Sequence, residues 1–245
     1  MKARVGGGIE IDFGAAPVNM DKTSFLYWVT EKLPFAKAHA ARQHFVFSAL
    51  SAHLEGTEGI RSVKEFFGGA GLGTSVVLDI FTPESYSVYE LDQDCIDHLR
   101  RQPWPDCVTI KQGDARQTMM EAGTADLMFM DYHLMNPVRL SDWQHQIDRV
   151  FKLRPKAVYL NDTSFWSMQL HRKRFGEALG APPLQSREEY IEAYSRYMLH
   201  RYNYSALAVS IHQGASFLYV PGPVPSTLVE HISVADGEKL MQTWN

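Results

Sequence analysis

A glycine-rich turn near residue 70 constrains the fold of this chain more than any other feature. A strand-like segment, 63–67, leads into residues 68–73, which contain four glycines, and a second strand-like segment, 86–92, ends in acidic residues. Such a turn between a strand and a helix lets a ligand approach the backbone, and a carboxylate about 20 residues later can bind ribose hydroxyls. The pattern predicts a pocket for a nucleotide-type cofactor.

Two phosphate-binding interpretations of this turn conflict with residue 74. Gly68 and Gly73 have the spacing of a P-loop, but Thr74 stands where the phosphate-binding lysine is required. A dinucleotide fingerprint that begins with Gly69 and Gly71 requires glycine or alanine at the same position. A third interpretation is that the glycines serve only a tight turn, where they relieve steric strain.

The spacing G-x-G-x-G at 69–73 instead resembles motif I of the class I S-adenosylmethionine (SAM) dependent methyltransferases. Residues 88–92 resemble the second motif of that family, whose carboxylate binds the ribose, and 113–115 resemble the third, whose aspartate approaches the adenine amino group. Residues 125–131 resemble the fourth strand, which ends at the methyl-transfer centre. All four motifs occur in the family's order, and the resemblance implies SAM as the cofactor.

The resemblance assigns cofactor binding residue by residue. The set is Phe67, Gly69, Gly71, Gly73, Glu90, Leu91, Asp114, Ala115 and Asp131. Glu90 is preferred as the ribose acid because it stands in register with the apolar strand, whereas Asp92 fits the N-cap of a helix at 93–101. Asp114 has an alternative role as a turn former, because aspartate commonly bonds the backbone nearby.

Asp131, Tyr132 and His133 are the predicted catalytic residues. Methyl transfer from a sulfonium is an in-line displacement that requires alignment and, for a protonated nitrogen or oxygen acceptor, removal of a proton. Asp131 fits a hydrogen bond either to the nucleophile or to the SAM amino group. Histidine titrates near neutral pH and suits a general base, although a surface-loop role for His133 is an equal alternative.

The signals for the acceptor conflict. Residues 65–71 resemble the D-x-F-x-G-x-G start of many DNA and RNA methyltransferases, but 131–134 lack the [DNS]-P-P-[YFW] motif of enzymes that methylate exocyclic amino groups. Neither cysteine lies in that loop, which excludes the nucleophile of cytosine-C5 enzymes. We expect a methyltransferase that acts on a nucleic-acid base or nucleotide. A small-molecule N- or O-methyltransferase and a non-catalytic SAM-binding or Rossmann-like partner subunit are the alternatives.

Strands and helices alternate from residue 63 onwards. The predicted parallel strands are 63–67, 87–91, 108–111, 126–130 and 157–160. A hairpin follows at 206–211 and 216–220. This order predicts an α/β fold with a doubly wound, mostly parallel seven-stranded sheet, a C-terminal antiparallel hairpin and helices on both faces. The predicted organisation is an N-terminal arm and helical lead-in at 1–59, a SAM-binding core at 60–222 and a tail at 223–245.

Additional helices are predicted at 23–33, 36–54 and 188–202, after a loose arm at 1–20. Three tyrosines of the last helix fit core packing.

The net charge of −4 provides no overall positive field for nucleic acid, so a polyanion site must be a local patch. Cys95 and Cys107 stand in apolar surroundings and predict buried thiols. Without a long apolar run, a cytoplasmic protein with no membrane contact and no metal site is expected; the oligomeric state stays open.

Overall fold

The computed structural model describes most of the chain as a large mixed sheet flanked by helices. The described residues are 2–5, 9–12, 34–55, 57–131, 137–161, 172–174, 176–211 and 214–222. The predicted helix at 23–33 and the predicted tail at 223–245 both lie outside these residues.

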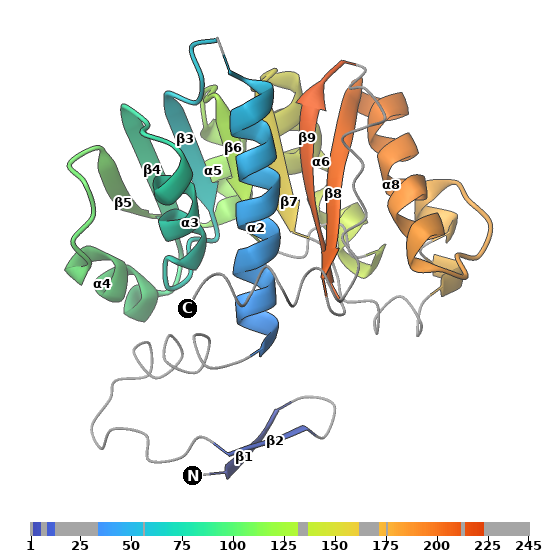
Figure 1. Ribbon diagram of the computed structural model, residues 1–245, viewed down its shortest axis with the longest axis horizontal. Helices are drawn as coiled ribbons and strands as arrows, with labels where there is room; N and C mark the ends of the chain where they lie inside the picture. Colours follow the sequence, from blue (N-terminus) through green and yellow to red (C-terminus); the bar gives the residue numbers. More distant parts are fainter. Residues whose placement is uncertain are drawn as a thin grey trace.

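Seven strands form the main sheet in the order β5-β4-β3-β6-β7-β9-β8 (Figure 1). Their bounds are β3 (Ser62–Phe66), β4 (Ser85–Glu90), β5 (Val108–Gln112), β6 (Leu127–Met130), β7 (Ala157–Asn161), β8 (Tyr204–Ile211) and β9 (Gly214–Pro221). Strands β3 to β7 are mutually parallel, whereas β9 runs antiparallel to both β7 and β8. The predicted fold class, including the C-terminal hairpin, is confirmed.

The strand order reverses at β3, which pairs with β4 on one side and with β6 on the other. In open α/β sheets, ligands bind outside the carboxyl ends of the strands at such a switch point. The ends of β3, β4, β5 and β6 are therefore the part of the fold in which a cofactor site is expected.

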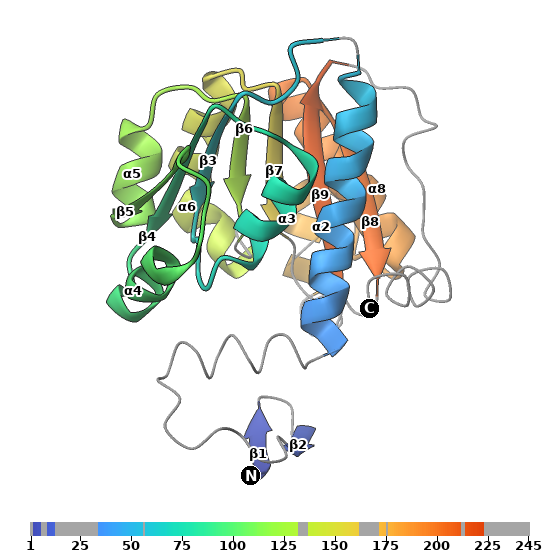
Figure 2. The same ribbon diagram turned by 60° about the vertical axis from the view of Figure 1, so that its left-hand side comes forward.

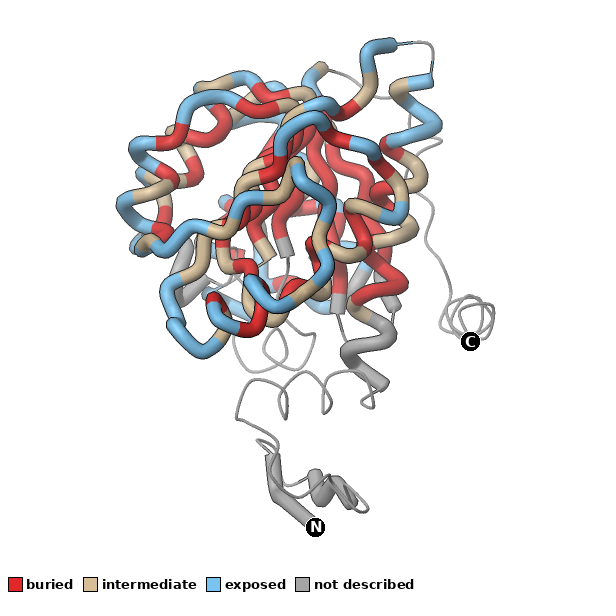
Figure 3. The backbone as a smooth tube through the Cα atoms, turned by 90° about the vertical axis from the view of Figure 1, so that its left-hand side faces the viewer, coloured by how far each residue is buried: buried red, intermediate tan, exposed pale blue. Residues whose placement is uncertain are grey.

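Helices cover both faces of the sheet (Figure 2). On one face lie α2 (Pro34–His53), α3 (Leu72–Ile80) and α4 (Gln93–Arg101); on the other lie α5 (Ala115–Glu121), α6 (Pro137–Lys152) and α8 (Arg187–Tyr202). Alternate side chains of β6 supply the two cores: Leu127 and Phe129 face α2 and α3, while Met128 and Met130 face the opposite helices. The strands are accordingly the most deeply buried part of the molecule (Figure 3).

Two predicted helices are confirmed with small shifts at their ends, as α2 and α8. Tyr190 and Tyr194 are fully buried and Tyr197 is partly buried, so the tyrosine stripe of α8 is core packing, as predicted. Among the described residues, no helix is long and apolar enough to cross a membrane.

Two sequence-based expectations are wrong. The arm predicted to be loose contains an antiparallel pair, β1 (Lys2–Val5) and β2 (Ile9–Asp12), whose alternating apolar and polar residues suit strands. Cys95 and Cys107 are partly exposed rather than buried. The physical reason is their location: Cys95 lies on the flank of α4, and Cys107 directly precedes β5, the edge strand.

Candidate functional site

The turn after β3 has an unusual backbone. Phe67, Gly69 and Gly71 have φ angles of 66°, 52° and 88°, all in the left-handed region. Gly71 is the N-cap of α3, so the chain passes from strand to helix within a few residues. Phe67 is the only one of the three with a side chain, so its left-handed backbone conformation is energetically unfavourable. Its ring packs against Trp143 at a centroid distance of 5.3 Å.

Packing explains most of the glycines in the turn. A Cβ on Gly73 would lie 2.4 Å from Cζ of Phe129, and a Cβ on Gly68 or Gly71 would lie 2.3 or 2.8 Å from a neighbouring side chain. A Cβ on Gly69 would meet only one backbone oxygen, at 4.0 Å. Of these glycines, only Gly69 therefore faces open space in which a ligand could contact the backbone.

Glu90 joins the end of β4 to the glycine turn. Its carboxylate accepts hydrogen bonds from the backbone N–H groups of Gly69 at 2.8 Å, Leu91 at 2.7 Å and Asp92 at 2.9 Å. A carboxylate has about four acceptor positions, so these bonds leave one for a ligand hydroxyl. Binding two ribose hydroxyls would require Glu90 to release one backbone bond.

The neighbouring acids cap helices. The carboxylate of Asp92 accepts from the N–H of Asp94 at 2.9 Å and of Cys95 at 3.4 Å, which is the N-cap role predicted for Asp92. Asp114 caps α5 by accepting from the N–H of Arg116 at 2.8 Å. The local backbone role considered for Asp114 is thus present, and its side chain also lines the cavity described next.

A cavity of about 510 Å³ lies where β3, β4 and β5 end. Its lining residues are Phe67, Tyr89, Glu90, Leu91, Asp92, Gly113, Asp114, Ala115, Arg116 and Trp143. Five of them belong to the predicted cofactor set, and they come from three separate stretches of sequence. The volume lies within the range of about 300–1,000 Å³ that is usual for small-molecule sites.

Aromatic rings and one cation, Arg116, form part of the cavity wall, and Lys111 contacts a wall residue from outside the lining. The Arg116 guanidinium lies 5.2 Å from the ring centroid of Trp143, and the Lys111 ammonium lies 5.4 Å from that of Tyr89. Leu91 is 60% exposed beside the same cavity, which is uncommon for a leucine. Such a wall suits a flat heteroaromatic ring, which gains from apolar and cation–π contacts. Sequence reasoning did not identify Trp143 or Arg116 as cavity residues.

Asp131 lies at the end of β6 and contacts helix α2. Its carboxylate accepts a hydrogen bond from His39 Nε2, at 2.9 Å to Oδ1 and 3.1 Å to Oδ2, and another from Gln43 Nε2 at 3.0 Å. Sequence reasoning missed both partners. Tyr132 and His133, the other predicted catalytic residues, lie outside the described residues.

A further acid, Glu65, lies buried on β3 beneath the turn. It accepts hydrogen bonds from Thr74 Oγ1 and from the Tyr86 hydroxyl, each at 2.7 Å, while its Oε1 has no hydrogen-bond partner in the described part of the chain. Burial raises the pKa of Glu65 to about 8, the two hydrogen bonds oppose this shift, and the nearby charges of Asp131 and Glu90 add to it. Glu65 is therefore mostly protonated at neutral pH.

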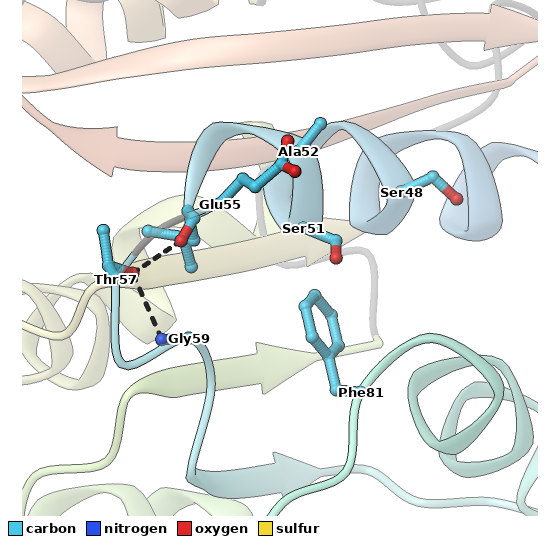
Figure 4. Close-up of a pocket in the computed structure, with 8 residues that line it drawn as sticks. Ser48, Ser51, Ala52, Glu55, Thr57, Gly59 and Phe81 are labelled. Atoms are coloured by element: carbon cyan, nitrogen blue, oxygen red, sulfur yellow. Dashed lines mark hydrogen bonds between the residues drawn. The ribbon is translucent and has the colours of Figure 1, made fainter.

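A second cavity, of about 520 Å³, lies at the opposite end of the sheet (Figure 4). Ser48 and Ser51 of α2, the Thr57–Gly59 turn and Phe81 line it, and Thr57 Oγ1 accepts from the Gly59 N–H at 3.1 Å. It contains none of the predicted site residues and lies near the amino end of β3. Because ligands of this fold class bind at carboxyl ends, the cavity beside Glu90 is the candidate cofactor site.

Comparisons with known proteins support the fold but not a closer relationship. No protein-family profile matches the sequence, and no curated protein sequence matches it. Solved methyltransferase structures do match its fold, at sequence identities between 9% and 15%.

The methyltransferase domain of bacterial CtHen1-C is 14% identical, with a TM-score of 0.54 over 76% of this chain and 100% of that one. The CurJ carbon methyltransferase is 15% identical, with a TM-score of 0.56 over 83% and 60%. The plantazolicin methyltransferase BpumL, in complex with a triazolic desmethylPZN analogue and SAH, is 9% identical, with a TM-score of 0.53 over 82% and 90%. The chain therefore has the fold of class I SAM-dependent methyltransferases.

Proposed function

We propose that this chain is a SAM-dependent methyltransferase. The proposal is supported chiefly by one observation: Phe67, Glu90 and Asp114, from the ends of three neighbouring strands, line the same cavity. The site also fits this cofactor chemically: Gly69 offers open space at the backbone, and Glu90 has an acceptor position left for a ribose hydroxyl. The charges of Glu90 and Asp131 favour a cationic ligand.

The residues divide into four roles. The turn containing Gly69, Gly71 and Gly73 supports the amino-acid part of the cofactor, and Glu90 binds the ribose. Leu91, Asp114 and Ala115 border the adenine. When bound, SAM supplies an electrophilic methyl group. Asp131 lies at the transfer end, where this chain's own residues align the acceptor and exclude water, and alignment alone can supply a large part of the rate enhancement.

For the acceptor we propose a nucleic-acid base or nucleotide. The D-x-F-x-G-x-G resemblance of residues 65–71 supports it, as does Arg116, a cation that lines the cavity in a chain whose net charge is −4. A small-molecule acceptor is the second candidate, favoured by the absence of the [DNS]-P-P-[YFW] motif from residues 131–134.

Cofactor binding is tested by isothermal titration of the protein with SAM and with SAH. We expect both to bind, and we expect Glu90→Ala to weaken binding at least about tenfold, since it removes a charged hydrogen-bond partner. Thermal unfolding of the variant checks that the turn, which Glu90 also holds, is intact. Glu84→Ala, which changes an exposed acid at the other end of β4, is the matched control. If the wild-type protein binds neither compound, the proposal fails.

The acceptor is tested by transfer of a radiolabelled methyl group to separate DNA, RNA, protein and metabolite pools. Labelling of a nucleic-acid or nucleotide fraction supports the proposed acceptor. Labelling of only non-nucleotide metabolites would replace it with the small-molecule alternative. Binding of SAM without transfer to any pool would indicate a non-catalytic subunit.

A further inference from the structure

Helix α2 directs polar side chains at Asp131 from a distant part of the sequence. His39 and Gln43, one turn apart, both contact the carboxylate, across 92 and 88 positions of the chain. We propose that His39 and Gln43 are positioning residues that fix the Asp131 carboxylate to receive a proton from the acceptor, which is therefore an N–H or O–H group. This inference rests on the proposed function and adds the residues and the acceptor chemistry of its transfer step.

The neighbours of His39 define its protonation. Arg42 Nη2 lies 3.3 Å from His39 Nδ1, and a guanidinium can only donate hydrogen bonds. Nδ1 therefore accepts this bond, and in the neutral ring the proton is then on Nε2, from which it donates to Asp131. Gln43 Nε2 lies 3.1 Å from the same His39 Nε2, and with this tautomer the Gln43 amide donates to Asp131 Oδ2 at 3.0 Å instead of to the ring. His39 is thus a fixed donor, and the member of the pair that can take a proton is Asp131.

The sheet holds this arrangement in place. Arg42 is 7% exposed, and its Nε donates to Ser216 Oγ on β9 at 3.3 Å, where Ser216 also accepts from the Tyr159 hydroxyl on β7 at 2.9 Å. The side chains of His39 and Asp131 are each 16% exposed, so the pair is anchored from behind and still reachable. Groups held by such a hydrogen-bonded support keep the geometry that proton transfer requires.

In the proposed step one bond forms, one bond breaks and one proton moves. The lone pair of the acceptor atom forms a bond to the methyl carbon, while the electron pair of the carbon–sulfur bond goes to sulfur. The acceptor's proton moves to a carboxylate oxygen of Asp131 and later to water. Positive charge that develops on the acceptor atom is stabilised by the carboxylate beside it, and the donors on α2 hold that carboxylate in a fixed orientation.

Two substitutions separate positioning from other roles. His39→Leu removes the donor, whereas His39→Gln retains an N–H group at similar reach. We expect His39→Leu to reduce methyl transfer about 100-fold, the effect of a misplaced catalytic group, and His39→Gln to recover most of the loss. SAH binding should be unchanged in both. His53→Leu, at an exposed histidine at the end of α2, is the matched control and should change neither quantity.

The ring itself is tested without an acceptor by ¹⁵N NMR of the histidine side chains. We expect His39 to be the Nε2–H tautomer and its signals to shift in Asp131→Asn. A proton on Nδ1, normal transfer by His39→Leu, or loss of SAH binding by a folded His39→Leu would each overturn the inference. Failure of the wild-type protein to bind SAM or SAH would refute the proposed function, and the NMR result would still decide the hydrogen-bond assignment.

Discussion

Glu65 should make the stability of this protein depend on pH in an unusual direction. The side chain is 1% exposed, its two hydrogen-bond donors are hydroxyl groups, and its pKa is raised from 4.5 to about 8, chiefly by burial. The unfolded chain therefore releases the proton of Glu65 at a much lower pH than the folded chain does. Where the folded state binds more protons, the free energy of unfolding falls as pH rises.

The size of the effect follows from the two pKa values. The contribution of Glu65 is fully present below pH 4.5 and is lost progressively until the pH passes about 8. The slope within that window is about 1.4 kcal/mol per pH unit. Over the window from 4.5 to about 8 the loss is on the order of 5 kcal/mol, an upper limit because water entry and relaxation weaken the effect.

Glu65→Gln isolates this contribution. The amide oxygen can still accept from Thr74 and Tyr86, but the side chain no longer titrates. We expect the stability of the variant relative to wild type to increase by about 2–3 kcal/mol from about pH 5.5 to about pH 7.5. Urea unfolding followed by circular dichroism at several pH values measures it. Glu84→Gln, at an exposed acid, should show no such trend, and parallel pH profiles of wild type and Glu65→Gln would refute the reasoning.

Three shorter predictions address the site. Gly73→Ala should lower the free energy of unfolding by about 1–3 kcal/mol, because its Cβ would lie 2.4 Å from Phe129 Cζ; unchanged urea unfolding would contradict this. Asp92→Ala should cost about 1 kcal/mol as a lost N-cap, and Asp92→Asn much less. Neither should alter SAH affinity, and a large loss in Asp92→Asn would transfer the ribose role from Glu90 to Asp92. SAH should change the tryptophan fluorescence of the wild-type protein, and much of this change should be absent in Trp143→Phe.

The fold was predictable because its signals are local. Each strand carries its own apolar pattern, and alternation with helices leaves a parallel sheet as the main solution. The same topology explains why Phe67, Glu90 and Asp114, from separate motifs, line one cavity: they lie at the carboxyl ends of neighbouring strands. Asp131, at the end of β6, is not among the lining residues of that cavity. The arm was wrongly predicted to be loose because three successive glycines, 6–8, indicate a loop. The segments on either side of them are short but alternate between apolar and polar residues, which is typical of strands.

The residues that sequence reasoning missed are positioned by tertiary packing. His39 and Gln43 contact Asp131 because of where α2 packs along the sheet. The sequence around these two residues does not determine that packing position. Trp143 could not be singled out, because it is one of several apolar residues at helical spacing in α6 and nothing local marks it as a cavity residue. The sequence analysis also missed the burial of Glu65, although Glu65 shares a face with the buried Val63 on a central strand and this alternation indicates a buried carboxyl.

The glycine pattern alone is weaker support for a cofactor site than its regular spacing suggests. Steric contact with protein side chains already requires glycine at 68, 71 and 73, as a tight turn without a ligand would also do. What a simple turn does not require is an acid at the end of the next strand that binds the Gly69 N–H and still has an acceptor position facing a cavity. Glu90 and the open face of Gly69 are therefore the features that indicate a nucleoside cofactor, and substitutions there test cofactor binding more directly than substitutions at the packed glycines.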